Sequence, residues 1–239
     1  MTAPARGGPR VAVIGDGKMG RTIVQLAPER GLTVCAMIGA RANDGGRGIN
    51  RAALNGADVV VEFTEPSAAA ANVEATIRAG VPIVCGTTGW YDVLPRLREL
   101  AIAMTGALFT APNFSVGVAL FARTAERAAR ALAPITTFDA HIVETHHAAK
   151  KDAPSGTAAM LRDRMQSALE RDVPVTSVRT GSVPGTHEVI FDAPFEQIRL
   201  THEARDRRVF ADGALLAARW LIGRTGAFGM NDLLDSLPT

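Results

Sequence analysis

RVAVIGDGKMGRTIVQL, residues Arg10 to Leu26, joins a short apolar run, a glycine-rich turn and a segment of helical periodicity. Val11 to Ile14 is a run typical of a buried strand, and apolar residues then recur at helical spacing from Met19 onward. A strand, a tight turn and a helix in this order form half of a βαβ unit. The stretch therefore predicts a parallel α/β sheet.

The turn inside this stretch fits the pattern G-x-G-x-x-G at Gly15, Gly17 and Gly20. In that pattern the first glycine permits the tight turn, the second lets the backbone approach a pyrophosphate, and the third allows close packing of helix on strand. A tight turn that binds nothing has the same spacing, but its place between strand and helix favours a dinucleotide site. The residues expected to contact the cofactor here are Gly15, Asp16, Gly17, Lys18, Met19 and Gly20.

The alternation of strand and helix continues downstream. Apolar runs predict further strands in LTVCAMIG, ADVVVEFT, VPIVCGTTG and ALFTAPN, and Ala-rich helical segments begin near Pro66 and Tyr91. This order predicts an α/β fold with a Rossmann-type doubly wound parallel sheet. We assign it to a dinucleotide-binding domain at residues 1–112, completed by residues 213–239 because the last long helix, at about 208–222, leads back to it.

After Asn113 the pattern changes. A helical stretch from Val116 to Leu132 precedes TTFDAHIVETHH, whose alternation suits a strand with one exposed face. A helix opening at Ser155 then leads to VTSVRTGSVPGTHEVIFDAPFEQIRLTHEA, which has the pattern of consecutive strands joined by Gly and Pro turns. These features predict a second α/β domain with an open mixed sheet at residues 113–212.

Charge and composition exclude several classes of partner. The formal net charge is +2, from 26 basic and 24 acidic residues spread evenly, so no basic stripe can track a nucleic acid. No uninterrupted apolar stretch reaches the length of a membrane span, about 18 residues. Cys35 and Cys85 lie in apolar runs and are expected to be buried free thiols. We expect a cytoplasmic protein with a frayed N-terminus and a small anion as its acidic partner.

Threonines follow the third and fourth predicted strands. Thr64, Thr87 and Thr88 stand at strand carboxyl ends, where ligands bind in an open parallel sheet, and could offer hydroxyl or backbone groups to a nicotinamide carboxamide. Ordinary turn chemistry explains the same residues without a ligand. Cys85 allows a rival hypothesis, a nucleophilic thiol as in acylating semialdehyde dehydrogenases, although its apolar and neutral neighbours disfavour it.

HIVETHHAAKKDAPSGTA, His141 to Ala158, concentrates groups that exchange protons and bind anions. His146 and His147 end a strand that points adjacent side chains to opposite faces, so at most one stays buried. Lys150 follows across a short loop. An imidazole titrates near neutral pH and a lysine attracts carboxylates, so the pair suits proton transfer to a bound anion.

A helix start completes this pocket. Ser155 precedes an apolar-periodic run, and Gly156 and Thr157 then expose N–H groups at the positive end of the helix dipole. A surface histidine pair and a plain helix cap are the alternatives, but the concentration of these groups at one junction favours an anion site. No histidine pair has companion ligands at zinc spacing, so we predict no metal. His187 and His202 are expected on a sheet face or an interface.

ETHHAAKKDAPSGTA resembles the E-x-H-H-x-x-K-x-D-A-P-S-G-T-A signature of the dihydrodipicolinate reductase family, also called 4-hydroxy-tetrahydrodipicolinate reductases, of the bacterial diaminopimelate and lysine pathway. VVVEFTEPSAA, GTTGW, APNFSVGV, GSVPGTHEV and RRVFADGALLAARWL resemble further family blocks in the same order. The resemblance covers essentially the whole chain. It implies that hydride passes from NADPH or NADH to a small cyclic imine dicarboxylate, giving tetrahydrodipicolinate, and that the open sheet builds a homotetramer.

The resemblance also implies residue roles. His146 is similar to the general acid/base of the family and Lys150 to its proton donor. Its substrate contacts would be His147, Ser155, Gly156 and Thr157. Its cofactor contacts, beyond Gly15 to Gly20, would be Gly86, Thr87, Thr88, Pro112, Asn113, Phe114 and Ser115.

Two departures from the family pattern concern the cofactor. The glycine loop is one residue shorter than usual, which leaves open a non-catalytic dinucleotide-sensing module on the same scaffold. No carboxylate stands between Cys35 and Arg41, where an NAD-preferring domain usually carries one for the ribose hydroxyls. Arg41 is placed to reach a 2′-phosphate and Lys18 could add a second charge, so we predict that NADPH is used at least as well as NADH.

Overall fold

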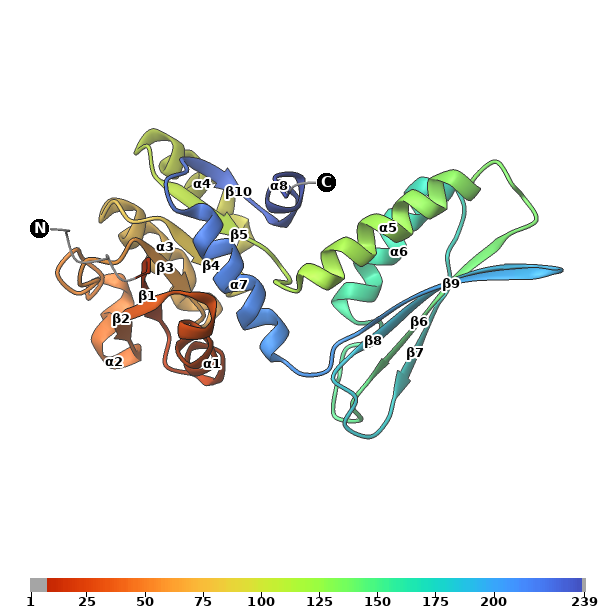
Figure 1. Ribbon diagram of the computed structural model, residues 1–239, viewed down its shortest axis with the longest axis horizontal. Helices are drawn as coiled ribbons and strands as arrows, with labels where there is room; N and C mark the ends of the chain where they lie inside the picture. Colours follow the sequence, from red (N-terminus) through yellow and green to blue (C-terminus); the bar gives the residue numbers. More distant parts are fainter. Residues whose placement is uncertain (1–7, 238–239) are drawn as a thin grey trace, which may run out of the picture. The chain divides into compact units, whose positions relative to one another are not determined.

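The computed structural model describes residues 8–237, and the chain divides into two compact units. One unit comprises Met1–Phe114 with Phe210–Thr239, and the other comprises Ser115–Val209. Both can be followed by colour along the sequence in Figure 1. The expected fraying of the N-terminus concerns residues 1–7, which lie outside the described residues.

The first unit is built on a parallel sheet. Its strands are β1 (Arg10–Ile14), β2 (Thr33–Ile38), β3 (Val59–Glu62), β4 (Ile83–Cys85), β5 (Ala107–Thr110) and β10 (Gly226–Phe228). Its α-helices are α1 (Lys18–Leu26), α2 (Ala40–Asn43), α3 (Pro66–Arg78), α4 (Leu94–Ala103), α7 (Arg208–Leu221) and α8 (Met230–Asp235). Short 3-10 helices are η1 (Pro28–Arg30), η2 (Asp44–Gly46) and η3 (Tyr91–Val93).

The strand order is β10-β5-β4-β3-β1-β2, and every neighbouring pair is parallel. From β1 the chain moves to β2 on one side and then to β3, β4 and β5 on the other, so the order reverses at β1. Ligands of doubly wound sheets bind at such a reversal, outside the carboxyl ends of the strands. The predicted Rossmann-type sheet is confirmed, and β10, which pairs with β5, is a strand that the sequence did not reveal.

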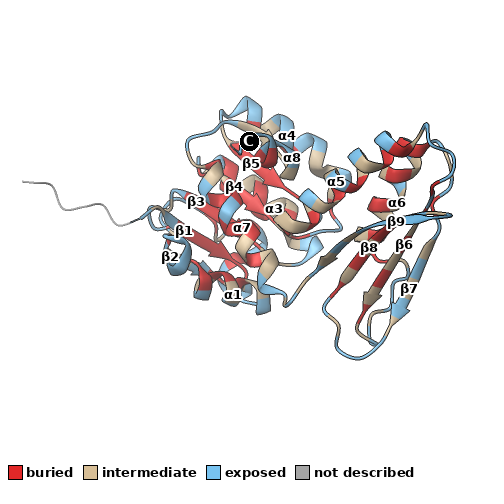
Figure 2. Cartoon of the chain, turned by 45° about the vertical axis from the view of Figure 1, so that its right-hand side comes forward, coloured by how far each residue is buried: buried red, intermediate tan, exposed pale blue. Residues whose placement is uncertain are grey.

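Helices cover both faces of this sheet, which explains the continuous apolar runs of its strands. Ala12, Ile14 and Val60 face a core shared with α3 and α4. Their neighbours Val11 and Val13, which point the other way, are equally buried. The buried strands stand out in Figure 2 as the red centre of the unit.

The second unit has a sheet of mixed direction. Its strands are β6 (Asp139–His146), β7 (Val175–Arg179), β8 (Thr186–Ala193) and β9 (Glu196–Glu203), in the order β7-β6-β8-β9, and its helices are α5 (Val116–Leu132) and α6 (Gly156–Leu169). Strand β6 is parallel to β7 and antiparallel to β8, which is antiparallel to β9. The predicted open mixed sheet is therefore confirmed.

Helices α5 and α6 lie side by side over one face of this sheet, as Figure 1 shows. Along β6, side chains alternate between buried and partly exposed, so Ile142, Glu144 and His146 all point to the helix-covered side. The buried face thus carries two ionisable groups at its carboxyl end. Glu144 and His146 form the centre of the candidate site.

Two composition-based expectations can be compared with the fold. Cys85 is buried as expected, but Cys35 is only partly buried because β2 is the edge strand of its sheet. Both are free thiols. Within residues 8–237, no helix combines the length and apolar character that crossing a membrane requires.

Candidate active site

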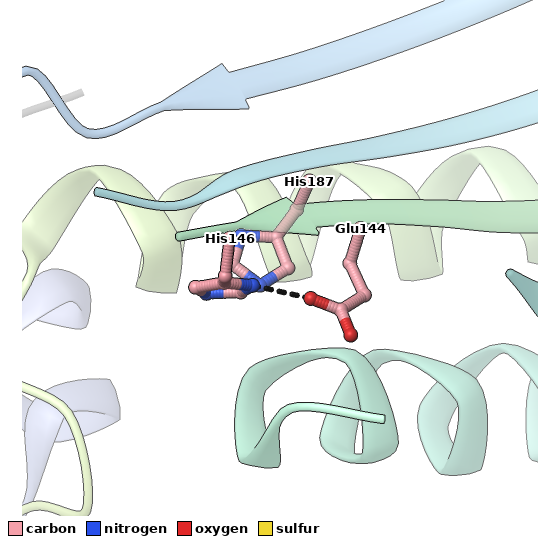
Figure 3. A group of neighbouring side chains, drawn as sticks. All are labelled: Glu144, His146 and His187. Atoms are coloured by element: carbon pink, nitrogen blue, oxygen red, sulfur yellow. Dashed lines mark hydrogen bonds and ion pairs between the residues drawn. The ribbon is translucent and has the colours of Figure 1, made fainter. Parts of the chain in front are cut away.

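The centre of the site is a carboxylate and imidazole pair on β6. Glu144 and His146 are two residues apart and share the buried face, so the Glu144 Oε2 meets the His146 Nδ1 in a short hydrogen bond (Figure 3). A carboxylate accepts only, so Nδ1 carries the proton of this bond. The neutral ring therefore keeps a free lone pair on Nε2.

Glu144 is fully buried, and its charge is balanced from the neighbouring strand. The Arg179 Nη2, on β7, lies 2.6 Å from the Glu144 Oε1, and the Ser155 backbone N–H donates to the same oxygen at 3.2 Å. Burial alone would raise the pKa of Glu144, but the hydrogen bonds from Arg179, Ser177, His146 and Ser155 outweigh it and lower the pKa to about 2. The carboxylate is thus ionised over the whole physiological range.

His146 is neutral at physiological pH. Burial lowers its pKa below the ordinary 6.5, the Glu144 carboxylate opposes that shift, and the charges of Lys150 and Arg179 add to it. Its Nε2 faces the loop between β7 and β8, where a Cβ added to Gly185 would stand 3.0 Å away. Gly185 has a φ of +154°, so both the backbone and the space beside the imidazole favour glycine there.

His187 of β8 is the second imidazole of this group. Its ring packs edge-on against that of His146, with centroids 5.2 Å apart, and its Nε2 lies 3.2 Å from the Ser155 Oγ. Burial and the neighbouring His146 lower the pKa of His187 to about 4, so it is uncharged at neutral pH. His187 was expected on a sheet face, and the face on which it lies is the one that carries the site. His202, in contrast, packs against Phe121 of α5.

Lys150 lies in the loop after β6. Its Nζ forms an ion pair with the Asp152 carboxylate at 2.8 Å, and its side chain is 23% exposed. The Lys150 charge is close enough to depress the His146 pKa, so the structure brings these two predicted residues together. His147 is only partly buried, as expected from the alternation of the strand.

The helix start predicted at Ser155 is the N-terminus of α6. Ser155 is the N-cap, and its Oγ accepts from the Ala158 N–H at 3.2 Å. The Ser155 side chain is buried and already paired with His187, so it supports the site from the interior. Space is open around Gly156, where a Cβ would meet no atom within 4 Å. In this first turn of α6, Gly156 is exposed and Thr157 is partly buried.

Glu144, His146 and His187 form a group whose ligand-type atoms lie within 4.8 Å of one another. Spacing along the sequence did not reveal this group, because His187 joins Glu144 and His146 only through the pairing of β6 with β8. Glu144 already accepts from Arg179, Ser155 and His146, and the Arg179 cation disfavours a second positive charge beside it. We assign no metal, and its absence stays a prediction.

The glycine loop of the first unit has the geometry that its spacing predicts. Gly15 has a φ of +110°, and a Cβ there would overlap the Phe63 carbonyl oxygen. A Cβ at Gly20 would overlap the Gly15 carbonyl oxygen, which explains the close helix packing. Around Gly17, the N-cap of α1, the space is open. Open space before the first N–H groups of a helix is the arrangement that binds a pyrophosphate in dinucleotide-binding domains.

A buried carboxylate organises the carboxyl ends of β3 and β4. Glu62 is fully buried and accepts from the Thr87 hydroxyl at 2.8 Å, the Cys85 thiol at 3.0 Å, the Asn72 amide at 3.1 Å and the Thr64 hydroxyl. The hydroxyls expected to face a nicotinamide are thus turned inward. Any cofactor contact at Thr64 or Thr87 would use other atoms.

This network also weakens the hypothesis of a nucleophilic cysteine. Burial, with the Glu62 charge and hydrogen bond, raises the pKa of the Cys85 thiol well above its ordinary value. A nucleophile needs the opposite shift. Cys85 is a hydrogen-bond donor to Glu62, which disfavours the rival hypothesis of a nucleophilic thiol.

The other predicted cofactor positions differ in exposure. Lys18, Arg41, Thr88 and Pro112 are exposed and free to meet a ligand, and Met19, Gly86 and Asn113 are partly buried. Phe114 is buried against Phe63 and Phe109, and Ser115 is the buried N-cap of α5. Phe114 and Ser115 therefore support the structure, whereas the exposed set can bind.

Comparison with known proteins now adds the family. The family model for the N-terminus of dihydrodipicolinate reductase matches residues 9–114, and that for its C-terminus matches residues 117–234. The chain belongs to the dihydrodipicolinate reductase family. It is an oxidoreductase, and the expected reductase role in diaminopimelate and lysine biosynthesis is confirmed. The matches do not support the non-catalytic alternative.

Individual relatives agree with the family models. The chain is 32% identical to the 4-hydroxy-tetrahydrodipicolinate reductase of Christiangramia forsetii, over 95% of this chain and 98% of the relative, and 38% identical to that of Acidiphilium cryptum, over 94% and 97%. The solved structure of dipicolinate-bound dihydrodipicolinate reductase from Paenisporosarcina sp. TG-14 shares the fold, with a TM-score of 0.79 and 21% identity over 94% of this chain and 99% of that one.

Within this reductase, sequence reasoning missed Glu144 and Arg179 as parts of the site and gave His187 only a weak candidacy on a sheet face. The signal for Glu144 was present, because a residue two positions before His146 on a strand shares its face. Arg179 and His187 join it only through strand pairing, since His146 is in register with Arg179 and Glu144 with His187. Neither pairing can be found from spacing along the chain.

Proposed function

We propose that the protein reduces 4-hydroxy-tetrahydrodipicolinate, by way of dihydrodipicolinate, to tetrahydrodipicolinate. The observation that carries this proposal is the buried Glu144–His146 pair beside the Lys150 ammonium and the open first turn of α6. A cyclic substrate with two carboxylates requires positive groups to bind it and a proton source to complete its reduction. These residues provide both.

His146 is proposed as the general acid/base. Its Nδ1 proton is held by Glu144, so proton exchange falls to Nε2, the atom that faces Gly185. A neutral imidazole can take up a proton from water on Nε2, and because the pKa of His146 is depressed, the imidazolium releases that proton readily to the reduced substrate. Glu144 stabilises the imidazolium that then forms, because its carboxylate is ionised throughout.

Lys150 is proposed to bind a substrate carboxylate and to donate the proton. Its ammonium is partly exposed and paired with the exposed Asp152, a partner that a substrate carboxylate can replace at little cost. The N–H groups of the first α6 turn, at Gly156 and Thr157, would hold the same anion. His147 would be a further substrate contact.

We propose NADPH or NADH as the cofactor, with NADPH used at least as well as NADH. The open space at Gly17 and the start of α1 suit the pyrophosphate, and Arg41 and Lys18 are exposed at the same sheet edge. When bound, the reduced nicotinamide supplies the hydride. The hydrogen bonds of Thr64 and Thr87 to Glu62 tie the segments after β3 and β4 together at this edge of the sheet.

The unit Ser115–Val209 is proposed to bind the substrate and to form a homotetramer. β9 is an edge strand with mostly exposed residues, and the hairpin before it presents a fully exposed Phe195. An unprotected edge and an exposed aromatic favour association. Light scattering at micromolar concentration that shows only monomer would contradict the tetramer. Cytoplasmic location stays a prediction that cell fractionation can test.

The activity is tested by following NADPH and NADH oxidation by absorbance, with substrate made in situ by the preceding synthase. Turnover that depends on both the synthase and this protein is the expected result. A folded protein that oxidises neither cofactor would overturn the proposal. His146→Ala is measured in parallel. If turnover falls sharply in this variant, the activity belongs to the protein and not to a contaminating reductase.

A further inference from the structure

An acidic side chain lies at the end of β2, although it belongs to the glycine loop and not to the residues that follow β2. Asp16 is exposed, and its carboxylate lies directly against Gly39, the first residue after β2. A Cβ added to Gly39 would stand 2.5 Å from the Asp16 Oδ2 and 2.8 Å from its Cγ. The Asp16 carboxylate thus fills the space where a side chain at position 39 would begin.

The backbone fixes this placement on both sides of Asp16. The Gly15 N–H donates to the Ile38 carbonyl oxygen at 2.9 Å, which ties the glycine loop to the last residue of β2. The Arg21 Nε donates to the Asp16 carbonyl oxygen at 2.9 Å and holds the peptide from the α1 side. The backbone of Asp16 is therefore held next to the end of β2.

In Rossmann domains that use NAD, a carboxylate at the end of β2 accepts hydrogen bonds from the adenosine ribose hydroxyls and repels a 2′-phosphate. The residues directly after β2 supply no such carboxylate in this chain. Asp44 is the first carboxylate there, and it is held by Arg47 in two hydrogen bonds of 2.9 and 2.8 Å. Asp16 lies at the required place, and among residues 8–237 its carboxylate forms no ion pair that would compete with a ligand.

We propose that Asp16 is the residue that binds the ribose hydroxyls of NADH and sets the ratio of NADH to NADPH use. The proposal rests on the proposed dinucleotide-dependent function. Arg41, two residues after Gly39, acts in the opposite direction because its charge favours a 2′-phosphate. One carboxylate and one guanidinium at the same strand end give a site that accepts either cofactor.

The test is the pair of dissociation constants for NADH and NADPH, measured by nucleotide fluorescence on the intact protein. Asp16→Asn keeps the size of the side chain and removes its charge. NADH binding should weaken by about tenfold while NADPH binding stays equal or tightens, because a charge-assisted hydrogen bond is lost and a repulsion is relieved. Asp44→Asn is the matched control and should leave the ratio within about twofold, since Asp44 already pairs with Arg47.

A second variant moves the carboxylate without changing it. Gly39→Ala places a methyl group against the Asp16 Oδ2 and should shift the ratio in the same direction as Asp16→Asn. A ratio that is unchanged in both folded variants would overturn the role of Asp16. Because binding is measured without turnover, absence of reductase activity would refute the proposed function and leave this test intact.

Discussion

Arg179 and Glu144 form an ion pair beneath the imidazole of His146, with the Arg179 Nη2 2.6 Å from the Glu144 Oε1. The guanidinium comes from β7 and the carboxylate from β6, so the parallel pairing of these two strands creates the pair. The other carboxylate oxygen is left to hold the His146 Nδ1. The arrangement resembles the support of a catalytic histidine by an ionised carboxylate in other enzyme classes.

Glu144→Gln should lower activity and move its pH dependence. The carboxylate raises the His146 pKa against the effect of burial, so its loss lowers that pKa further and shifts the acid limb of the kcat profile to lower pH. We expect kcat to fall by about tenfold or more because the ring loses its orientation. An acid limb that stays in place, in a folded variant, would show that Glu144 has no influence on the titrating group.

The same carboxylate should make stability depend on pH. The Glu144 pKa is about 2 in the folded protein against 4.5 ordinarily, so its contribution is present above pH 4.5 and is lost as the pH falls toward 2. A shift of this size corresponds to about 3 kcal/mol. Urea unfolding of wild type and Glu144→Gln across that window should show the difference between them shrinking with falling pH. A constant difference would contradict the assigned shift.

His146 and Lys150 should give different kinetic signatures. His146→Ala should lose roughly 10²- to 10⁴-fold in kcat with little change in KM for the dicarboxylate, because His146 acts on the proton. Lys150→Ala should lower kcat and raise that KM, because Lys150 also binds a carboxylate. Steady-state kinetics at saturating cofactor distinguish the two. An unchanged kcat in His146→Ala would refute its role.

Gly185→Ala should crowd the working nitrogen of His146. The added Cβ would stand 3.0 Å from Nε2, in the space a proton-exchanging group needs, so kcat should fall by about tenfold. Gly181→Ala, in the same loop, is the control: it too has a positive φ, of +52°, but a Cβ there meets no atom within 4 Å. Equal losses in both variants would mean that backbone strain, not contact with His146, causes the effect.

What could be predicted from the sequence was local. The glycine loop, the helix start at Ser155 and the alternation that buries His146 each depend on residues a few positions apart, so pattern and propensity suffice. The unexpected features are non-local. Asp16 meets Gly39 because β1 and β2 pair in parallel, and Glu62 collects donors from α3 and β4.

The same distinction explains where the expected cofactor contacts need revision. Thr64 and Thr87 were predicted as cofactor contacts because they follow strands, and both residues do lie at the carboxyl edge of the sheet. What the pattern could not reveal is the buried Glu62 beneath them, to which both hydroxyls donate. A buried carboxylate requires hydrogen-bond donors, and the hydroxyls of Thr64 and Thr87 are close enough to serve Glu62.

Glu62 should therefore matter for cofactor binding although it is fully buried. In Glu62→Gln, one of the two carboxylate oxygens becomes an NH2 group, which donates and cannot accept. The side chains that now donate to Glu62 are Thr64, Asn72, Cys85 and Thr87, so at least one of these buried groups loses its acceptor. The expected cost is about 1–3 kcal/mol of stability, seen as a lower Tm, with a raised Kd for NADPH at temperatures where the variant is folded. An unchanged Kd would limit Glu62 to a structural role.

Cys85 provides the matched comparison for this network, because its thiol donates to the same carboxylate at 3.0 Å. Cys85→Ser keeps a donor and should retain most of the activity and nearly the wild-type Tm. Cys85→Ala removes the donor and should lower the Tm by a few degrees, with kcat little changed. Kinetics and thermal melting of the two variants check both statements. If Cys85→Ser abolished turnover in a well-folded protein, the thiol would have a chemical role after all, against its raised pKa and its burial.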